Sequence, residues 1–105
     1  MEIKETLLIS LDYDDTFTAN PIFWKKFIDL AIEEGHRIVI ATMRHEHEGR
    51  NLEILLADHV EKIIYTGRKA KKPFLKKLGI EPDIWVDDMP EFLVEDAKKI
   101  SLSNS

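Results

Sequence analysis

Four short apolar runs alternate with four amphipathic segments along this chain, and that order predicts an α/β fold. Two observations favour a doubly wound sandwich with a short parallel sheet of about four strands and helices on both faces. The runs are short and nearly continuous in apolar residues, as in strands that are buried on both sides. Polar residues that are suited to binding follow each run, where a strand is expected to end.

The four runs are the predicted strands. In order along the chain they are Thr6–Leu11 (TLLISL), Arg37–Ala41 (RIVIA), Lys62–Tyr65 (KIIY) and Ile84–Val86 (IWV). In the last three, Ile or Val residues that favour strands make up most of the apolar positions. The first is mostly Leu and Ile, so its assignment depends on its place in the alternating order.

The segments between the runs place apolar residues at helical spacing. Asn20 followed by Pro21 predicts the start of the first helix, because a side-chain cap precedes a proline in the first turn, and Gly35 predicts its end. The apolar faces expected for the four helices are Phe23, Phe27, Leu30 and Ala31; Leu52, Leu55 and Leu56; Phe74, Leu75 and Leu78, closed by Gly79; and Leu93, Ala97 and Ile100. With right-handed crossovers, this order predicts a three-layer, Rossmann-like sandwich.

Length and composition limit what the chain can be. With 105 residues it is expected to form one domain over residues 1–100, followed by a disordered tail over residues 101–105. The absence of cysteine excludes disulfides, zinc–cysteine sites and thiol catalysis. The formal net charge of −5 argues against a dedicated nucleic-acid coat. No run approaches the ~20 apolar residues that cross a bilayer, so we expect a cytoplasmic protein without a membrane partner.

Side chains that can carry chemistry follow the predicted strands, and the carboxyl ends of parallel strands meet at one edge of the sheet. They are Asp12 and Asp14 after the first strand, Thr42 and Arg44 after the second, Lys69, Lys71 and Lys72 after the third, and Asp87 and Asp88 after the fourth. Clustered carboxylates repel one another unless a cation compensates them, and Mg²⁺ suits carboxylates together with a phosphate. Hydroxyl groups and cations beside them suit the oxygens of a phosphoryl group.

The same residues resemble the motifs of the haloacid dehalogenase (HAD) superfamily of phosphotransferases. Leu11–Thr16 (LDYDDT) is similar to the first motif, an apolar run followed by D-x-D-x-T. Thr42 in VIATMR, a lysine in KAKKP and the acidic pair in IWVDDMP are similar to the second, third and fourth motifs. The order and the strand context agree over residues 6–100, so the resemblance implies a HAD-type fold.

The resemblance also implies a role for each of these residues. Asp12 is expected to be the nucleophile that forms an aspartyl-phosphate, and Asp14 the general acid and base. Thr42 and a lysine, either Lys71 or Lys72, are expected to hold the phosphoryl oxygens. The expected ligands of Mg²⁺ are Asp87 and Asp88, together with Asp12 and the backbone carbonyl of Asp14. Together these roles imply an Mg²⁺-dependent phosphatase that hydrolyses phosphomonoesters.

Two departures from the family pattern stand out. Asp15 occupies a position where many members have glycine, and we expect it to serve the turn. Only Thr16–Ala19 separate the acidic motif from the first helix cap, which leaves no room for an inserted cap domain. An open site favours a bulky substrate, such as a phosphorylated nucleic-acid end or protein, or a roof supplied by another subunit of a homo-oligomer. A basic run of Arg68, Lys69, Lys71, Lys72, Lys76 and Lys77 would steer an anionic polymer if it lies at the same edge.

Other interpretations of these residues remain open at this point. The aspartates also suit turns and helix caps, Arg44 suits a solvated loop, and His45 and His47 suit exposed positions more than a metal site. A receiver-like phosphoacceptor domain shares the acids, threonine and lysine, but its acceptor normally follows the third strand. A Toprim-type domain pairs its acids differently. A non-catalytic binding module on the same fold is the remaining alternative.

Overall fold

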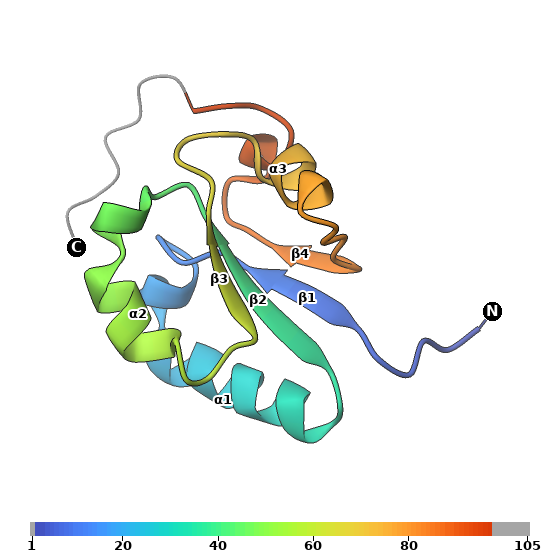
Figure 1. Ribbon diagram of the computed structural model, residues 1–105. Helices are drawn as coiled ribbons and strands as arrows, with labels where there is room; N and C mark the ends of the chain where they lie inside the picture. Colours follow the sequence, from blue (N-terminus) through green and yellow to red (C-terminus); the bar gives the residue numbers. More distant parts are fainter. Residues whose placement is uncertain (1, 98–105) are drawn as a thin grey trace.

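The computed structural model of the protein describes residues 2–97 and contains a four-stranded, all-parallel sheet (Figure 1). The strands are β1 (Leu8–Leu11), β2 (Arg37–Thr42), β3 (Lys62–Tyr65) and β4 (Ile84–Val86), in the order β3-β2-β1-β4. The helices are α1 (Pro21–Glu33), α2 (Arg50–Leu56) and α3 (Lys71–Lys77). This arrangement confirms the predicted α/β sandwich.

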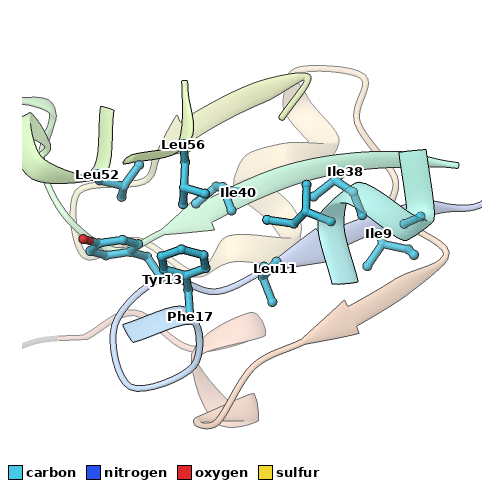
Figure 2. Packing of buried hydrophobic residues seen from close by; sticks show 10 residues of the cluster. Ile9, Leu11, Tyr13, Phe17, Ile38, Ile40, Leu52 and Leu56 are labelled. Atoms are coloured by element: carbon cyan, nitrogen blue, oxygen red, sulfur yellow. The ribbon is translucent and has the colours of Figure 1, made fainter. Parts of the chain in front are cut away.

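Different helices cover the two faces of the sheet. In Figure 1, α1 and α2 lie on one side of the sheet, and α3 lies on the other. Figure 2 shows the larger core, on the α1–α2 side, where Leu11, Ile40 and Phe17 are each fully buried. The smaller core on the α3 side contains Leu75, with the half-buried Trp85 packed against it. The buried strands are therefore apolar on both sides, as their sequences predict.

The apolar face of α1 differs from the predicted one. Ile28 and Ala31 are buried and Phe27 packs against the core, whereas Phe23 and Leu30 are 55% and 58% exposed. Trp24 packs against the same core, so the inward face follows residues 24, 27, 28 and 31, a regular helical stripe. The predicted start of α1 is confirmed, because the side chain of Asn20 accepts a hydrogen bond from the backbone of Phe23 at 3.1 Å.

The predicted fourth helix is wrong over the part that the structure describes. A short 3₁₀ helix, η3 (Pro90–Leu93), stands in its place. The chain then turns back, because the backbone N–H of Ala97 donates to the carbonyl of Arg68 at 2.8 Å. Residue 97 therefore bonds to a distant loop instead of to a preceding turn of its own helix. Ile100 and the predicted tail, residues 101–105, lie outside the described residues.

The register of the sheet sets which strand ends are neighbours. Leu11, the last residue of β1, pairs with Ile40 of β2 on one side and with Val86 of β4 on the other. Thr42, the last residue of β2, pairs with Tyr65 of β3. The residues that follow β1 and β4 are therefore adjacent, and those that follow β2 and β3 form a second adjacent pair of loops.

Candidate active site

The ends of β1 and β4 bring three aspartates together. The backbone N–H of Asp12 donates to the carbonyl of Val86 at 2.9 Å, so the pairing of the two strands continues one residue past β1. Asp87 and Asp88 follow Val86 directly. Asp12 is buried, Asp87 is half-buried and Asp88 is exposed, so the group extends from the interior to the surface.

Lys71 connects two of these acids. Its Nζ lies 2.7 Å from Oδ1 of Asp12 and 2.5 Å from Oδ2 of Asp87, and its side chain is only 3% exposed. An ammonium in this position compensates the repulsion between the two carboxylates. The other two candidate lysines do not reach these acids: Lys72 is exposed, and Lys69 is exposed and lies 3.8 Å from Asp96.

Thr16 is a site residue to which the sequence assigned no separate role. It is buried, and its Oγ1 lies 3.0 Å from Oδ2 of Asp12 and 3.2 Å from Oδ1 of Asp88. The same oxygen also accepts a hydrogen bond from the backbone N–H of Asp88 at 3.2 Å. Thr16 therefore holds the β1 and β4 loops together. Its place as the last residue of D-x-D-x-T was the signal that could have identified this role.

The donor set at this edge fits a hard divalent cation. One carboxylate oxygen from each of Asp12, Asp87 and Asp88 lies within 4.8 Å of the others, and these three residues form the one such group of His, Cys, Asp or Glu within residues 2–97. Carboxylate oxygens are the ligands that Mg²⁺ prefers. The side chain of Asp14, a predicted metal-site residue through its backbone carbonyl, is not part of this group.

The environment of Asp12 opposes its ionisation. Burial raises the pKa of Asp12 to about 7, and the neighbouring charge of Asp87 acts in the same direction, whereas Lys71 acts against both. A carboxylate that is costly to ionise in the absence of a further cation is typical of a site that binds one.

Asp14 and Arg44 form a buried ion pair. Arg44 donates from Nη2 to Oδ1 of Asp14 at 2.6 Å and from Nε to Oδ2 at 2.9 Å. Both side chains are 10% exposed. Nη1 of Arg44 donates to the backbone carbonyl of Glu48 at 2.8 Å, and the guanidinium lies 5.2 Å from the centre of the Tyr13 ring. The predicted phosphate-binding arginine thus contacts the predicted acid–base residue.

Thr42 ends β2 at the same edge. It is 1% exposed, and its Oγ1 accepts a hydrogen bond from the backbone N–H of Arg44 at 3.2 Å. This contact fixes the start of the loop that carries Arg44. Within residues 2–97, Thr42 makes no hydrogen bond to the three clustered acids, so the sheet edge places it near them without joining it to them.

His45 and His47 lie beyond Arg44 on the same loop. Both are exposed, and their rings stack with centroids 5.5 Å apart and an interplanar angle of 10°. Neither belongs to the group of potential metal ligands found within residues 2–97.

Comparison of the chain with protein-family models, curated proteins and solved structures finds no match. No helix within residues 2–97 is both long and apolar enough to cross a membrane.

Proposed function

We propose that this protein is an Mg²⁺-dependent phosphomonoester hydrolase that uses Asp12 as its nucleophile. The observation that supports this best is the position of Lys71, whose Nζ lies within hydrogen-bond distance of both Asp12 and Asp87. A buried cation beside an acidic group with the donor atoms of a metal site is the arrangement that phosphoryl transfer requires, because the reaction depends on positioning and on charge neutralisation.

Asp12, Asp87 and Asp88 would hold the metal ion, since they supply the grouped oxygen atoms. Bound Mg²⁺ supplies charge neutralisation for the phosphoryl oxygens during transfer. Thr16 keeps Asp12 and Asp88 at a fixed separation through its hydroxyl group. Lys71 adds a second positive charge on the buried side of the site, where water does not screen it.

The reaction has two steps. In the first, Asp14, once released by Arg44, takes a proton from the solvent; a carboxylate oxygen of Asp12 forms a bond to phosphorus, the ester P–O bond breaks, and the leaving alkoxide takes that proton from Asp14. In the second, water attacks the phosphorus of the aspartyl-phosphate and gives a proton to Asp14. The bond between Asp12 and phosphorus then breaks, which releases inorganic phosphate and restores the carboxylate of Asp12.

Asp14 has to leave Arg44 to take part in these steps, because both of its oxygens accept hydrogen bonds from that guanidinium. A substrate phosphate offers Arg44 another bidentate partner. We therefore infer that the arriving phosphate competes for Arg44 and so releases Asp14 for proton transfer.

Hydrolysis of a generic aryl phosphate with and without Mg²⁺ tests the proposal. The wild-type protein should release phosphate with Mg²⁺ and stop when EDTA removes the metal. Asp12→Asn should show no turnover while circular dichroism shows an intact fold. Full activity of the Asp12→Asn protein would refute the role of Asp12.

The Arg44–Asp14 pair favours one second candidate, a phosphoacceptor domain. If the pair persists after Asp12 is phosphorylated, no base is available to activate water, and the aspartyl-phosphate accumulates. Incubation with a small phosphate donor and Mg²⁺ separates the two functions: a hydrolase releases phosphate in many turnovers, whereas a phosphoacceptor retains one phosphate per chain, which intact-protein mass spectrometry detects.

A further inference from the structure

Two surface recesses lie beside the candidate active site, and they share one lysine. The first, which we call the His45 recess, has a volume of about 370 Å³ and is lined by His45, Glu46, Tyr65, Thr66, Gly67 and Lys69. The second, the Phe74 recess, has a volume of about 450 Å³ and is lined by Lys69, Ala70, Pro73, Phe74, Lys77 and Asp96. Both volumes lie in the range of roughly 300–1,000 Å³ that is typical of ligand sites.

The His45 recess belongs to the loops that follow β2 and β3. The backbone N–H of Gly67 donates to the carbonyl of Arg44 at 3.2 Å, which joins the two loops. The ring of His45 lies so close to Gly67 that a Cβ there would be 2.8 Å from Nδ1. Glycine therefore allows the imidazole to approach the loop closely. The result is a recess with aromatic walls directly beside the residue that holds Asp14.

The aromatic wall of this recess is fixed in place. The hydroxyl group of Tyr65 donates to Glu53 at 2.7 Å, and the other ring of the recess, that of His45, stacks on His47. Rings that are already ordered lose little freedom when another flat ring packs against them, which favours binding of a heterocyclic base.

The Phe74 recess follows α3 away from the active site. Lys71 is the first residue of this helix, and Phe74 and Lys77 lie three and six residues farther along it. Phe74 is half-buried, and Lys77 is exposed and forms no ion pair within residues 2–97. The recess therefore combines an aromatic ring with a cation that is available to an anionic ligand.

The basic residues between Arg68 and Lys77 have different environments in the structure. Arg68 donates to both oxygens of Glu48, at 2.9 and 3.0 Å, so its charge is compensated within the protein. Lys71 is held in the active site. The cations that line the recesses are Lys69, which lies 3.8 Å from the exposed Asp96, and Lys77, and the rings of Tyr65 and Phe74 line the same recesses.

We propose that the two recesses bind a single-stranded nucleic acid whose terminal phosphate is the substrate of the active site; this inference rests on the proposed function. Sites for single strands combine cations that follow the phosphates with aromatic rings on which the bases stack. The protein has a net charge of −5, so attraction of a polyanion depends on these few local cations. A phosphopeptide would use the lysines but would bring no bases to stack on the rings of Tyr65 and Phe74, which line the recesses.

Binding of a fluorescent oligothymidylate of about eight nucleotides without a terminal phosphate tests this proposal separately from catalysis. Fluorescence anisotropy over a salt series gives the affinity of the wild-type protein and its salt dependence. Lys69→Ala and Lys77→Ala should each weaken binding severalfold and reduce the slope of log affinity against log salt by about 0.7. His45→Ala should weaken binding about fivefold, as expected for the loss of one stacked base.

Lys26→Ala is the matched control, because Lys26 is an exposed lysine on α1 that lines neither recess. Its affinity and salt slope should equal those of the wild type. Equal effects of Lys26→Ala and Lys77→Ala would overturn the proposal, as would tighter binding of a phosphoserine peptide of the same charge. The two proposals fail separately. Oligonucleotide binding without any phosphatase activity would refute only the proposed function. Hydrolysis of aryl phosphate without oligonucleotide binding would refute only the proposal that the two recesses bind a nucleic acid.

Discussion

Arg44 and Asp14 form a two-point ion pair, with Nη2 2.6 Å from Oδ1 and Nε 2.9 Å from Oδ2, and both side chains are 10% exposed. The pair joins the loop after β1 to the loop after β2. It determines where the expected acid–base residue points before a substrate arrives. A buried carboxylate with two charge-assisted hydrogen bonds has a fixed orientation, so any role of Asp14 in proton transfer begins with the loss of this contact.

Removal of one partner of this pair should destabilise the protein. Arg44→Ala leaves the carboxylate of Asp14 buried without its partner, and we expect the free energy of unfolding to fall by about 3 kcal/mol. Urea denaturation of Arg44→Ala, Asp14→Asn and the double variant measures the effect. The double variant should lose less than the sum of the two single losses. Additive losses would show that the two side chains do not interact in solution.

Lys71, and not the adjacent Lys72, should be required for both the stability of the fold and the hydrolysis of phosphate esters. Lys71→Met leaves Asp12 and Asp87 without their shared cation, so we expect a loss of about 3 kcal/mol in stability in EDTA. We also expect a decrease of about 100-fold or more in the hydrolysis rate with Mg²⁺. Lys72→Met changes an exposed residue and should shift stability by less than about 0.5 kcal/mol. Equal effects of the two substitutions, measured by urea denaturation and aryl phosphate hydrolysis, would contradict this assignment.

Mg²⁺ should stabilise the folded protein through the three aspartates. A ligand present at 100 times its dissociation constant adds about 2.7 kcal/mol to the free energy of unfolding when it binds only the folded state. Thermal melting should therefore shift upward with Mg²⁺ in the wild type and much less in Asp87→Asn or Asp88→Asn. Asp29→Asn, an exposed aspartate on α1, is the control and should keep the full shift. An equal shift in all four proteins would place the ion elsewhere.

Low pH should reduce the stability of the folded protein, partly because it protonates Glu48. Hydrogen bonds from Arg68, and one from the backbone of His45, hold the pKa of Glu48 at about 2 instead of its ordinary 4.5. Because the pKa is lower in the folded state, this contribution is complete above about pH 4.5 and is lost as the pH falls toward 2. Glu48→Gln should therefore show a smaller drop in melting temperature between about pH 6 and pH 3 than the wild type. An identical drop in both proteins would show that Glu48 is not selectively stabilised.

The fold class could be predicted because most of the strands and connecting helices carry a local signal, and the alternating order supplied the first strand. The Val and Ile residues of β2 predict a buried strand, and the Asn20–Pro21 pair predicts where α1 begins; the structure confirms both. Asp15 has a φ of 61°, in the left-handed region where glycine is usual and where aspartate is one of the better tolerated alternatives. The turn that the sequence predicted there is confirmed by that angle.

The parts that could not be predicted depend on contacts between distant segments. The choice between Lys71 and Lys72 requires the first turn of α3, which begins at Lys71 and places Pro73 inside the helix, where a proline in the first turn is still tolerated. The prediction of a fourth helix was wrong because the backbone hydrogen bond between Ala97 and Arg68 is formed across the fold and leaves no local pattern in the sequence. The Arg44–Asp14 pair likewise depends on side-chain torsions that no spacing encodes.

The most direct test of the central claim is to trap phosphate on the nucleophile. Wild-type protein that is turning over aryl phosphate with Mg²⁺ is quenched with borohydride, which reduces an acyl phosphate to an alcohol and releases the phosphate. Peptide mass spectrometry should then find homoserine in place of aspartate at position 12, and aspartate unchanged at positions 14, 87 and 88. Sustained hydrolysis with unmodified Asp12 in the quenched protein would contradict the account.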